Sequence, residues 1–291
     1  MDNAYVHPTP GFTGRVLATI ANNAAIRWIR RTAMGPLPFA RLASDVEDVV
    51  YLTWIVPVER VRAFVPPGVA IVDRAGLTLF TILTYRHGHF GAKWLGPLRR
   101  LCPSPLQSNW RLYVESLPGE AVPALPVPAR TVLFLRNVFD SPAYALGSRI
   151  ASDALPSHLA GGFVHRRSGD GYETRIDPGA GSAPALASTT LPAPAKSLPA
   201  GYDRFFASWA GAVRFLCGQD AAVAATGKNG RLAQAGISLP IDLDTVVPLQ
   251  STDTRGTGFL EALGAAGEPF CFAVPKVRFE VLWERMLPRR G

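Results

Sequence analysis

Residues 77–86, "LTLFTILTYR", decide the fold class of this chain. Successive side chains of a β-strand point to opposite faces of the sheet, and here both faces carry large apolar residues. Such a strand must be covered on both sides, so we expect it at the centre of a sheet.

Further strands are indicated on either side of this segment. They are expected at residues 48–56, 108–116, 130–139 and 269–283, with hairpins that turn at 169–171 and within "GKNGR" (227–231). Helical patterns occur at 13–32, 141–154 and 201–216, and a short helix is indicated in 57–69, where Pro66, Pro67 and Gly68 end it. Because helices and strands do not alternate regularly, we predict a mostly antiparallel, barrel-like α+β fold and not a doubly wound parallel sheet.

The N-terminal segment is predicted to be a single amphipathic helix from Thr13 to about Thr32, with an apolar stripe that includes Ala21 and Trp28. We therefore divide the chain into a helical extension, residues 1–44, and one domain, residues 45–291. The extension is expected to pack on that domain or on a second subunit of a homo-oligomer. A helix lying on a membrane surface is the alternative, because arginines follow its apolar stripe.

The composition of the chain excludes several classes of protein. With 48% hydrophobic and 18% charged residues, its 291 residues can bury a large core. The net charge of +8 comes from 26 arginines and 4 lysines that are scattered along the chain. The bias toward arginine is typical of a GC-rich bacterial genome. Because the basic residues are scattered and not gathered on one helix, we expect no nucleic-acid partner. No apolar run approaches the ~20 residues of a membrane span, so a membrane location is not expected either.

Three cysteines, Cys102, Cys217 and Cys271, show no Cys-x-x-Cys spacing. An odd number without metal-ligand spacing favours neither a disulfide framework nor a structural zinc site. We therefore expect a cytoplasmic protein with no metal and no cofactor.

Residues 85–91, "YRHGHFG", contain His87 and His89, which would share one face of a strand. A metal site would require a third ligand, and no carboxylate lies nearby in the sequence. The simpler interpretation is a pair that is either solvated or at the rim of a pocket, and at a pocket either ring could transfer a proton.

Residues 107–115, "QSNWRLYVE", contain the most informative pattern for ligand binding. If they form a strand, residues 110, 112 and 114 share an apolar face, and Asn109, Arg111 and Tyr113 share the other. Arg111 between hydrogen-bonding neighbours suits a carboxylate ligand, although an exposed polar face would give the same pattern. No acidic residue occurs from 75 to 114, which predicts a neutral or positive cavity for an anionic small molecule.

Four segments in this order resemble domain-of-unknown-function family 2071, which is similar to acetoacetate decarboxylase. They are residues 50–69 ("VYLTWIVPVERVRAFVPPGV"), 108–115, 141–160 ("SPAYALGSRIASDALPSHLA") and 227–237 ("GKNGRLAQAGI"). The resemblance covers about residues 45–285. It implies an acetoacetate decarboxylase-like β-barrel with flanking helices and a central pocket for a small molecule.

The same resemblance places Ser157 where the decarboxylase has its reactive lysine, after the Leu155-Pro156 turn. Serine cannot form the Schiff base that this lysine makes with its substrate, so acetoacetate decarboxylation by that route is not expected. The family's glutamate before the Asn-x-Arg strand is replaced by Gln107. Either Ser157 or His158 could still face the pocket, with His158 as a general acid–base, or both could merely connect two elements.

We expect a small-molecule enzyme of the lyase, dehydratase, cyclase or isomerase type, using non-covalent acid–base chemistry on an oxygenated, anionic substrate. Arg111 and Asn109 would hold a carboxylate or enolate beside Gln107, and one of the histidines would move the proton. The alternative is a non-catalytic binding protein that retains its ligand through Arg111 and aromatic walls such as Trp54 and Tyr113.

Overall fold

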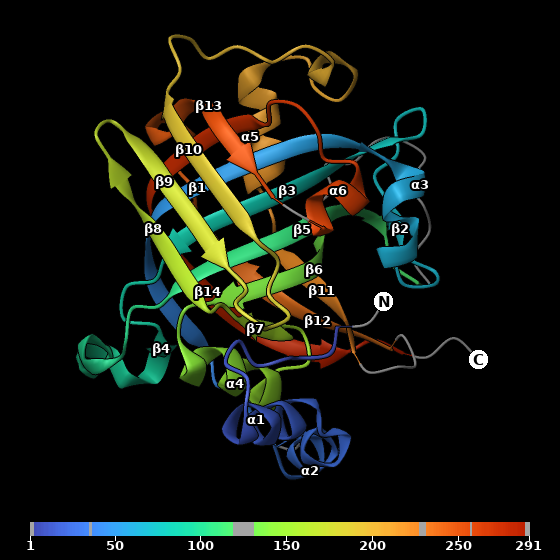
Figure 1. Ribbon diagram of the computed structural model, residues 1–291, viewed down its shortest axis with the longest axis vertical. Coiled ribbons are helices and arrows are strands. Elements are labelled where there is room, and N and C mark those ends of the chain that lie inside the picture. The colour runs from blue at the N-terminus through green and yellow to red at the C-terminus, as the bar shows by residue number, and fades with distance from the viewer. Residues whose placement is uncertain (1–2, 35–36, 119–130, 227–230, 257, 289–291) are drawn as a thin grey trace.

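The computed structural model describes residues 3–34, 37–118, 131–226, 231–256 and 258–288 (Figure 1). The strands are β1 (Leu42–Pro57), β2 (Ala70–Ile71), β3 (Leu77–Arg86), β4 (Gly91–Ala92), β5 (Leu106–Ser116), β6 (Thr131–Phe139), β7 (Ser157–Leu159), β8 (Gly162–Ser168), β9 (Gly171–Asp177), β10 (Leu186–Pro192), β11 (Ala221–Thr226), β12 (Arg231–Ser238), β13 (Val247–Arg255) and β14 (Phe270–Met286). The helices are α1 (Phe12–Asn22), α2 (Ala24–Met34), α3 (Val58–Val61), α4 (Pro142–Ala151), α5 (Trp209–Cys217) and α6 (Phe259–Leu263), with 3₁₀ turns η1 (Arg62–Phe64), η2 (Lys93–Leu101), η3 (Tyr202–Arg204) and η4 (Leu243–Thr245).

Seven strands form a closed ring in the order β1, β3, β5, β6, β11, β12 and β14, and β14 pairs back onto β1. Every pairing in the ring is antiparallel except that between β6 and β11. The central position predicted for residues 77–86 is confirmed, because β3 lies between β1 and β5. The α+β class with mostly antiparallel strands is confirmed as well.

A second group of strands, β13, β10, β9 and β8, continues from β14 and lies in front of β3 and β5 in Figure 1. An apolar core fills the space between this group and the outer face of the ring, and it includes Trp54, Phe80, Trp110, Tyr172 and Leu249. Alternate residues of the ring strands point the other way, into its interior. The β8–β9 hairpin turns at Gly169 and Asp170 as expected, whereas residues 227–230 of the predicted β11–β12 turn lie outside the described residues.

Helix α5 covers one end of the ring, where Trp209, Val213 and Leu216 pack with the inward-facing residues of β1 and β3. The helix begins at Trp209, later than the sequence pattern indicated. Ser208 caps it, because the Ser208 hydroxyl accepts a hydrogen bond from the Gly211 amide. The preceding residues form the separate turn η3.

The N-terminal segment forms two helices, and the prediction of one continuous helix was wrong. Asn23 has an extended backbone, and its side chain accepts hydrogen bonds from the Ala25 and Ile26 amides, which ends α1 and caps α2. The predicted apolar stripe is only partly covered, since Ala21 is buried but Trp28 is 64% exposed. Both helices lie beside α4 at the end of the molecule opposite α5 (Figure 1). No helix in the described ranges is long and apolar enough to cross a membrane.

Candidate functional site

A cavity of about 900 Å³ occupies the interior of the ring. One end lies at Arg111, which is 3% exposed and sits against α5. The other end is bordered by α2, α4 and residues 37–40, where Leu37 is 62% exposed. The cavity therefore opens at the end of the ring that carries the N-terminal helices.

Strand β5 contributes a row of polar side chains to the cavity wall. Gln107, Asn109 and Arg111 all line the cavity, because alternate residues of a strand share one face. Trp110, between them in sequence, lies in the outer core. These three are the sequence-predicted binding residues that the fold brings together.

Arg111 places a positive charge at the deep end of the cavity. Its Nη2 donates a hydrogen bond to the Leu216 carbonyl oxygen at 2.7 Å, and its guanidinium lies 5.6 Å from the ring centres of Tyr51 and Tyr113. Within the described residues no carboxylate is paired with it. Burial lowers the pKa of Arg111, but the neighbouring Tyr113 and Tyr51 outweigh this effect and the pKa is raised, so the charge is retained.

Gln107 is held by a chain of buried hydrogen bonds behind the cavity wall. Its Oε1 lies 2.6 Å from His87 Nε2, and His87 Nδ1 lies 2.8 Å from the Ser44 hydroxyl. Burial lowers the pKa of His87 to about 4, so the ring is neutral at neutral pH. Since an amide oxygen can only accept, Nε2 carries the hydrogen and Ser44 donates to Nδ1. This chain leaves the Gln107 amide NH₂ as the donor available to the cavity.

Asn109 has unused hydrogen-bonding capacity. Its Nδ2 donates to Asn137 Oδ1, but neither Asn109 Oδ1 nor Asn137 Nδ2 has a partner among the described residues. Both side chains are buried, with Asn109 only 4% exposed. A buried polar atom without a partner is costly, so the Asn109 oxygen is suited to a hydrogen-bond donor in the cavity.

Two tyrosines in the cavity wall were missed by the sequence reasoning. Tyr51 on β1 and Tyr85 on β3 both line the cavity, and burial raises the pKa of each well above its ordinary value. Burial also raises the pKa of Cys217, next to Tyr51, to about 12. Both phenols are therefore neutral and can donate hydrogen bonds. The signal for Tyr51 was its position in the predicted strand 48–56, on the face opposite Trp54.

The other predicted binding residues lie behind or outside this wall. The Tyr113 hydroxyl donates to Thr81 Oγ1 at 3.0 Å and contacts the Leu216 carbonyl, and Tyr113 does not line the cavity. Trp54 points to the opposite face of β1, where its Nε1 donates to the Gly267 carbonyl. Trp54 is thus in the outer core and does not form an aromatic wall of the cavity.

His158 and Ser157 lie on the short strand β7, beside β6, and neither lines the cavity. The His158 ring is held between Ser182 Oγ at 2.7 Å and Asn3 Oδ1 at 2.6 Å. Burial, with the charges of Arg149 and Arg136, lowers its pKa well below the ordinary value. The Ser157 hydroxyl donates to the Leu155 carbonyl. The structure therefore gives both residues a packing role between the N-terminal segment and the ring.

The remaining histidines also lie outside the cavity wall. His87 is fully buried behind Gln107 and stacks on Phe90, with ring centres 4.2 Å apart. His89 has a left-handed backbone, with φ of 54°, so it does not continue the strand and does not share a face with His87. In the described part of the chain no cluster of His, Cys, Asp or Glu could hold a metal ion.

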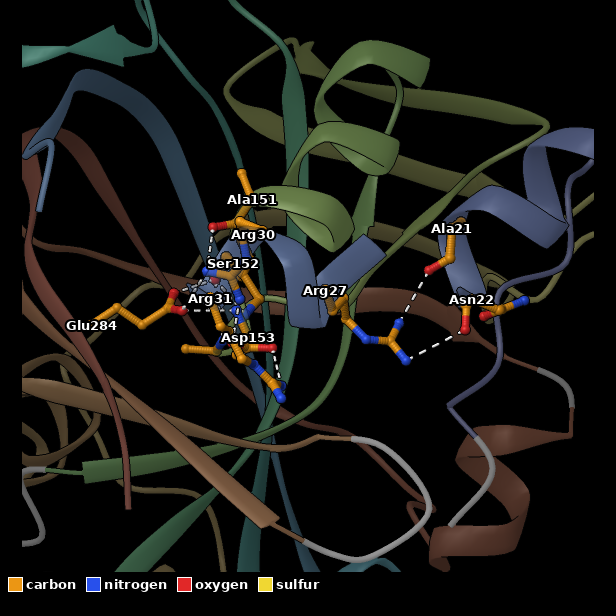
Figure 2. A network of polar contacts seen from close by, with 11 residues as sticks. Ala21, Asn22, Arg27, Arg30, Arg31, Ala151, Ser152, Asp153 and Glu284 are labelled. Carbon is orange, nitrogen blue, oxygen red and sulfur yellow. Dashed lines mark hydrogen bonds and ion pairs between the residues drawn. The ribbon is translucent and has the colours of Figure 1, made fainter. Parts of the chain in front are cut away.

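The rim of the cavity carries a network of charges around Asp153, shown in Figure 2. Arg30 and Arg31 of α2 both pair with this carboxylate, which is 3% exposed, and Arg31 binds it through Nε and Nη2. Glu284 of β14 accepts from the Asp153 amide at 2.8 Å. Burial raises the pKa of Asp153, but the two arginines outweigh this effect and lower it. This network fastens α2 across the cavity opening.

Asp153→Asn is therefore expected to loosen α2. The free energy of unfolding should fall by about 1–2 kcal/mol, less than for a fully buried pair because both guanidinium groups are partly solvated. Amide hydrogen exchange of residues 24–34 should be faster in the variant than in the unmodified protein, and exchange of β3 should be unchanged. Asp253→Asn, which removes the exposed Arg255–Asp253 pair, is the matched control and should change neither quantity. Unchanged exchange in α2 of the Asp153 variant would contradict this role.

Comparison with known proteins supports the fold. No protein-family model and no curated protein matches the chain at the sequence level. The structure is similar to the enduracididine biosynthesis enzyme MppR complexed with pyruvate (TM-score 0.56, 12% identity, 87% of this chain and 92% of that chain). It is also similar to an acetoacetate decarboxylase-like enzyme from Sphingomonas wittichii RW1, with a TM-score of 0.55 and 10% identity over 87% of this chain and 96% of that chain. Acetoacetate decarboxylase from Legionella pneumophila has a TM-score of 0.52 and 10% identity over 87% of this chain and 92% of that chain. The chain thus has the acetoacetate decarboxylase-like fold.

Proposed function

We propose that this protein is an enzyme that binds an oxygenated, anionic small molecule in the cavity of the ring and transforms it without a covalent intermediate. The observation that carries the proposal is Arg111, a buried guanidinium at the deep end of the cavity with no carboxylate paired with it in the described chain. A buried charge without a counter-ion is unfavourable, and a ligand carboxylate would supply the missing charge through two parallel hydrogen bonds.

The neutral tyrosines suggest how such a ligand could react. A carboxylate at Arg111 would place the adjacent carbonyl or hydroxyl group near Tyr51, whose protonated phenol can donate to a developing enolate. The Gln107 amide NH₂ would donate to a further oxygen atom of the ligand, and Asn109 Oδ1 would accept from a ligand hydroxyl group. These roles supply the acid of a lyase, dehydratase, cyclase or isomerase reaction in place of the histidine that the sequence suggested. The proton that the substrate loses would pass to solvent water in the cavity, because the neutral phenols cannot accept it.

A Schiff-base mechanism is not part of the proposal. Lys93 pairs with Glu280, Lys196 lies over Trp209, and Lys276 pairs with Glu47, and none of the three lines the cavity. Lys228 lies outside the described residues. None of the three described lysines therefore offers an amine to the cavity, which supports a proposal without a Schiff base.

The test uses 2-oxo and 3-oxo acids, because a neighbour of the same fold is named as a pyruvate complex. Each acid is incubated with the protein, with and without an aldehyde, and followed by NMR. We expect turnover of at least one acid. Tyr51→Phe should reduce that turnover about 100-fold, the scale of general-acid catalysis, with little change in affinity. Tyr172→Phe, in the outer core, is the matched control.

Borohydride reduction in the presence of the same acids should leave the protein mass unchanged. A covalent adduct would contradict the non-covalent mechanism. Binding of an acid that returns chemically unchanged in every reaction would instead favour the second candidate, a non-catalytic binding protein. The largely apolar wall of the cavity favours that candidate, since no histidine or lysine of the described residues reaches it.

Membership of domain-of-unknown-function family 2071, a bacterial cytoplasmic location and a homo-oligomeric state remain proposals. The three cysteines are free in the structure, which is compatible with a reducing compartment. The boundary at residue 44 also remains a prediction, with β1 beginning at Leu42.

A further inference from the structure

We infer that the ligand of this cavity is an amphiphilic carboxylate, with its carboxylate at Arg111 and a long apolar body that extends toward α4 and residues 37–40. The inference rests on the proposed function in one respect, the anion at Arg111. It goes further by assigning the chemistry of the rest of the ligand.

The volume of the cavity is the first argument. At about 30 Å³ per water molecule, about 900 Å³ corresponds to roughly 30 water-sized groups. A three-carbon oxo acid at Arg111 would fill only a small part of this space. The remaining apolar wall would then stay in contact with water, which is unfavourable.

The distribution of polar groups is the second argument. The polar residues of the deep wall all come from β1, β3 and β5. The facing wall, from β12, β14 and α4, is mostly apolar and includes Ile237, Val277, Val281 and Ala143; its polar members are Tyr144, Ser148, Glu284 and Arg285. A ligand that is polar at one end only, with an aliphatic or aromatic remainder, matches both walls.

The opening of the cavity is the third argument. Leu37 and Phe39, which line it, are 62% and 38% exposed, and Ile29 on α2 is 57% exposed. Residues 3–44 contain five arginines and no acidic residue. At the rim itself Arg30 and Arg31 are paired with Asp153, so the entrance is marked mainly by its exposed apolar side chains, which suit an amphiphilic ligand better than a strongly hydrated one.

Isothermal titration of the full chain with butanoate, hexanoate, octanoate and decanoate tests the inference. Each buried methylene group contributes about 0.8 kcal/mol, so the dissociation constant should fall roughly three- to fourfold per added methylene group. Octan-1-ol, the neutral counterpart of octanoate, should bind more weakly than octanoate to the unmodified chain. Arg111→Met should remove that difference while leaving the dependence on chain length.

Gly147→Phe provides a variant that shortens the cavity. Gly147 lies on α4 in the cavity wall, and a Cβ atom added there meets no atom within 4 Å. The new side chain therefore has room to enter the cavity, and replacement of a helical glycine does not weaken the helix. Decanoate should lose at least tenfold in affinity in this variant, and butanoate should be nearly unaffected.

The outcomes separate this inference from the proposed function. Equal affinity of the unmodified chain for butanoate and decanoate would overturn the amphiphilic ligand and leave the anion site at Arg111 intact. The same conclusion would follow if the Gly147 variant lost affinity equally for both acids. Chain-length dependence that persists without any preference for the carboxylate would instead overturn the anion site. Failure of every acid to bind would overturn both.

Discussion

Arg111→Met is expected to raise the dissociation constant of a carboxylate ligand by about 100-fold or more and, at the same time, to stabilise the unliganded protein. Loss of one partner of a buried charge pair costs 2–5 kcal/mol of binding free energy, which accounts for the first effect. The second effect follows because the guanidinium is buried without a counter-ion, and methionine has similar length and no charge. We expect the free energy of unfolding to rise by about 1 kcal/mol, since the Leu216 hydrogen bond and the two tyrosine rings already offset part of the cost.

Arg149→Met is the matched control for this experiment. The Arg149 guanidinium is also buried, but it donates to the Ser157 and Asn3 carbonyl oxygens and lies outside the cavity wall. Its removal takes these donors from the buried Ser157 carbonyl and the partly buried Asn3 carbonyl, so the protein should lose stability and keep its ligand affinity. Calorimetry and urea unfolding measure both quantities. Unchanged carboxylate affinity in the Arg111 variant, or destabilisation equal to that of the Arg149 variant, would contradict the assignment of Arg111 as an anion site.

When the pH is lowered, the protein is expected to lose stability at pH values well above those at which most carboxylates titrate. Burial lowers the pKa of His87 to about 4 and lowers the pKa values of His158 and His165 as well. The unfolded chain takes up these protons near pH 6.5, so between about pH 6.5 and pH 4 it binds more protons than the folded chain. The free energy of unfolding therefore falls as the pH is lowered through this range, by roughly 3 kcal/mol at pH 4 from His87 alone.

Urea unfolding between about pH 7.5 and pH 4.5 measures this loss of stability. His87→Asn should flatten the dependence, because the variant lacks one of the buried groups that must take up a proton on unfolding. NMR titration of the five histidines gives the pKa of His87 directly. A His87 pKa above 6.5, or an identical pH dependence in the variant, would contradict the buried neutral ring. The lowered pKa of Asp153 changes the free energy of unfolding only below the ordinary pKa of an aspartate. Its effect therefore falls at a more acidic pH than the loss of stability that the histidines cause.

Strand periodicity was enough to predict much of the fold and part of the site. The apolar character of both faces of residues 77–86 placed that strand at the centre of the sheet, as observed for β3. The alternation in residues 107–115 separated Trp110 from Asn109 and Arg111, and the structure shows the same separation between outer core and cavity. Both predictions succeed because a strand exposes its side chains with a fixed period of two.

Residues whose surroundings come from distant segments could not be placed in this way. His158 and Ser157 occupy one short strand, and the direction of the His158 ring is set by Asn3 and Ser182, far away in the sequence. The absence of acidic residues from 75 to 114 predicted a neutral or positive cavity but not which of the basic residues in that segment would line it, and Arg111 alone of them does. The others, such as Arg99, which pairs with Asp45, lie outside the wall. Local sequence does not reveal which side of the ring a loop residue occupies.

A crystal structure of the protein with decanoate bound would test the central claim most directly. We predict that the ligand carboxylate lies within hydrogen-bonding distance of the Arg111 guanidinium and that the alkyl chain passes Gly147 toward the opening bordered by α2, α4 and residues 37–40. A carboxylate bound at Arg30 and Arg31 on the rim, or an empty cavity with Arg111 turned toward another group, would contradict it.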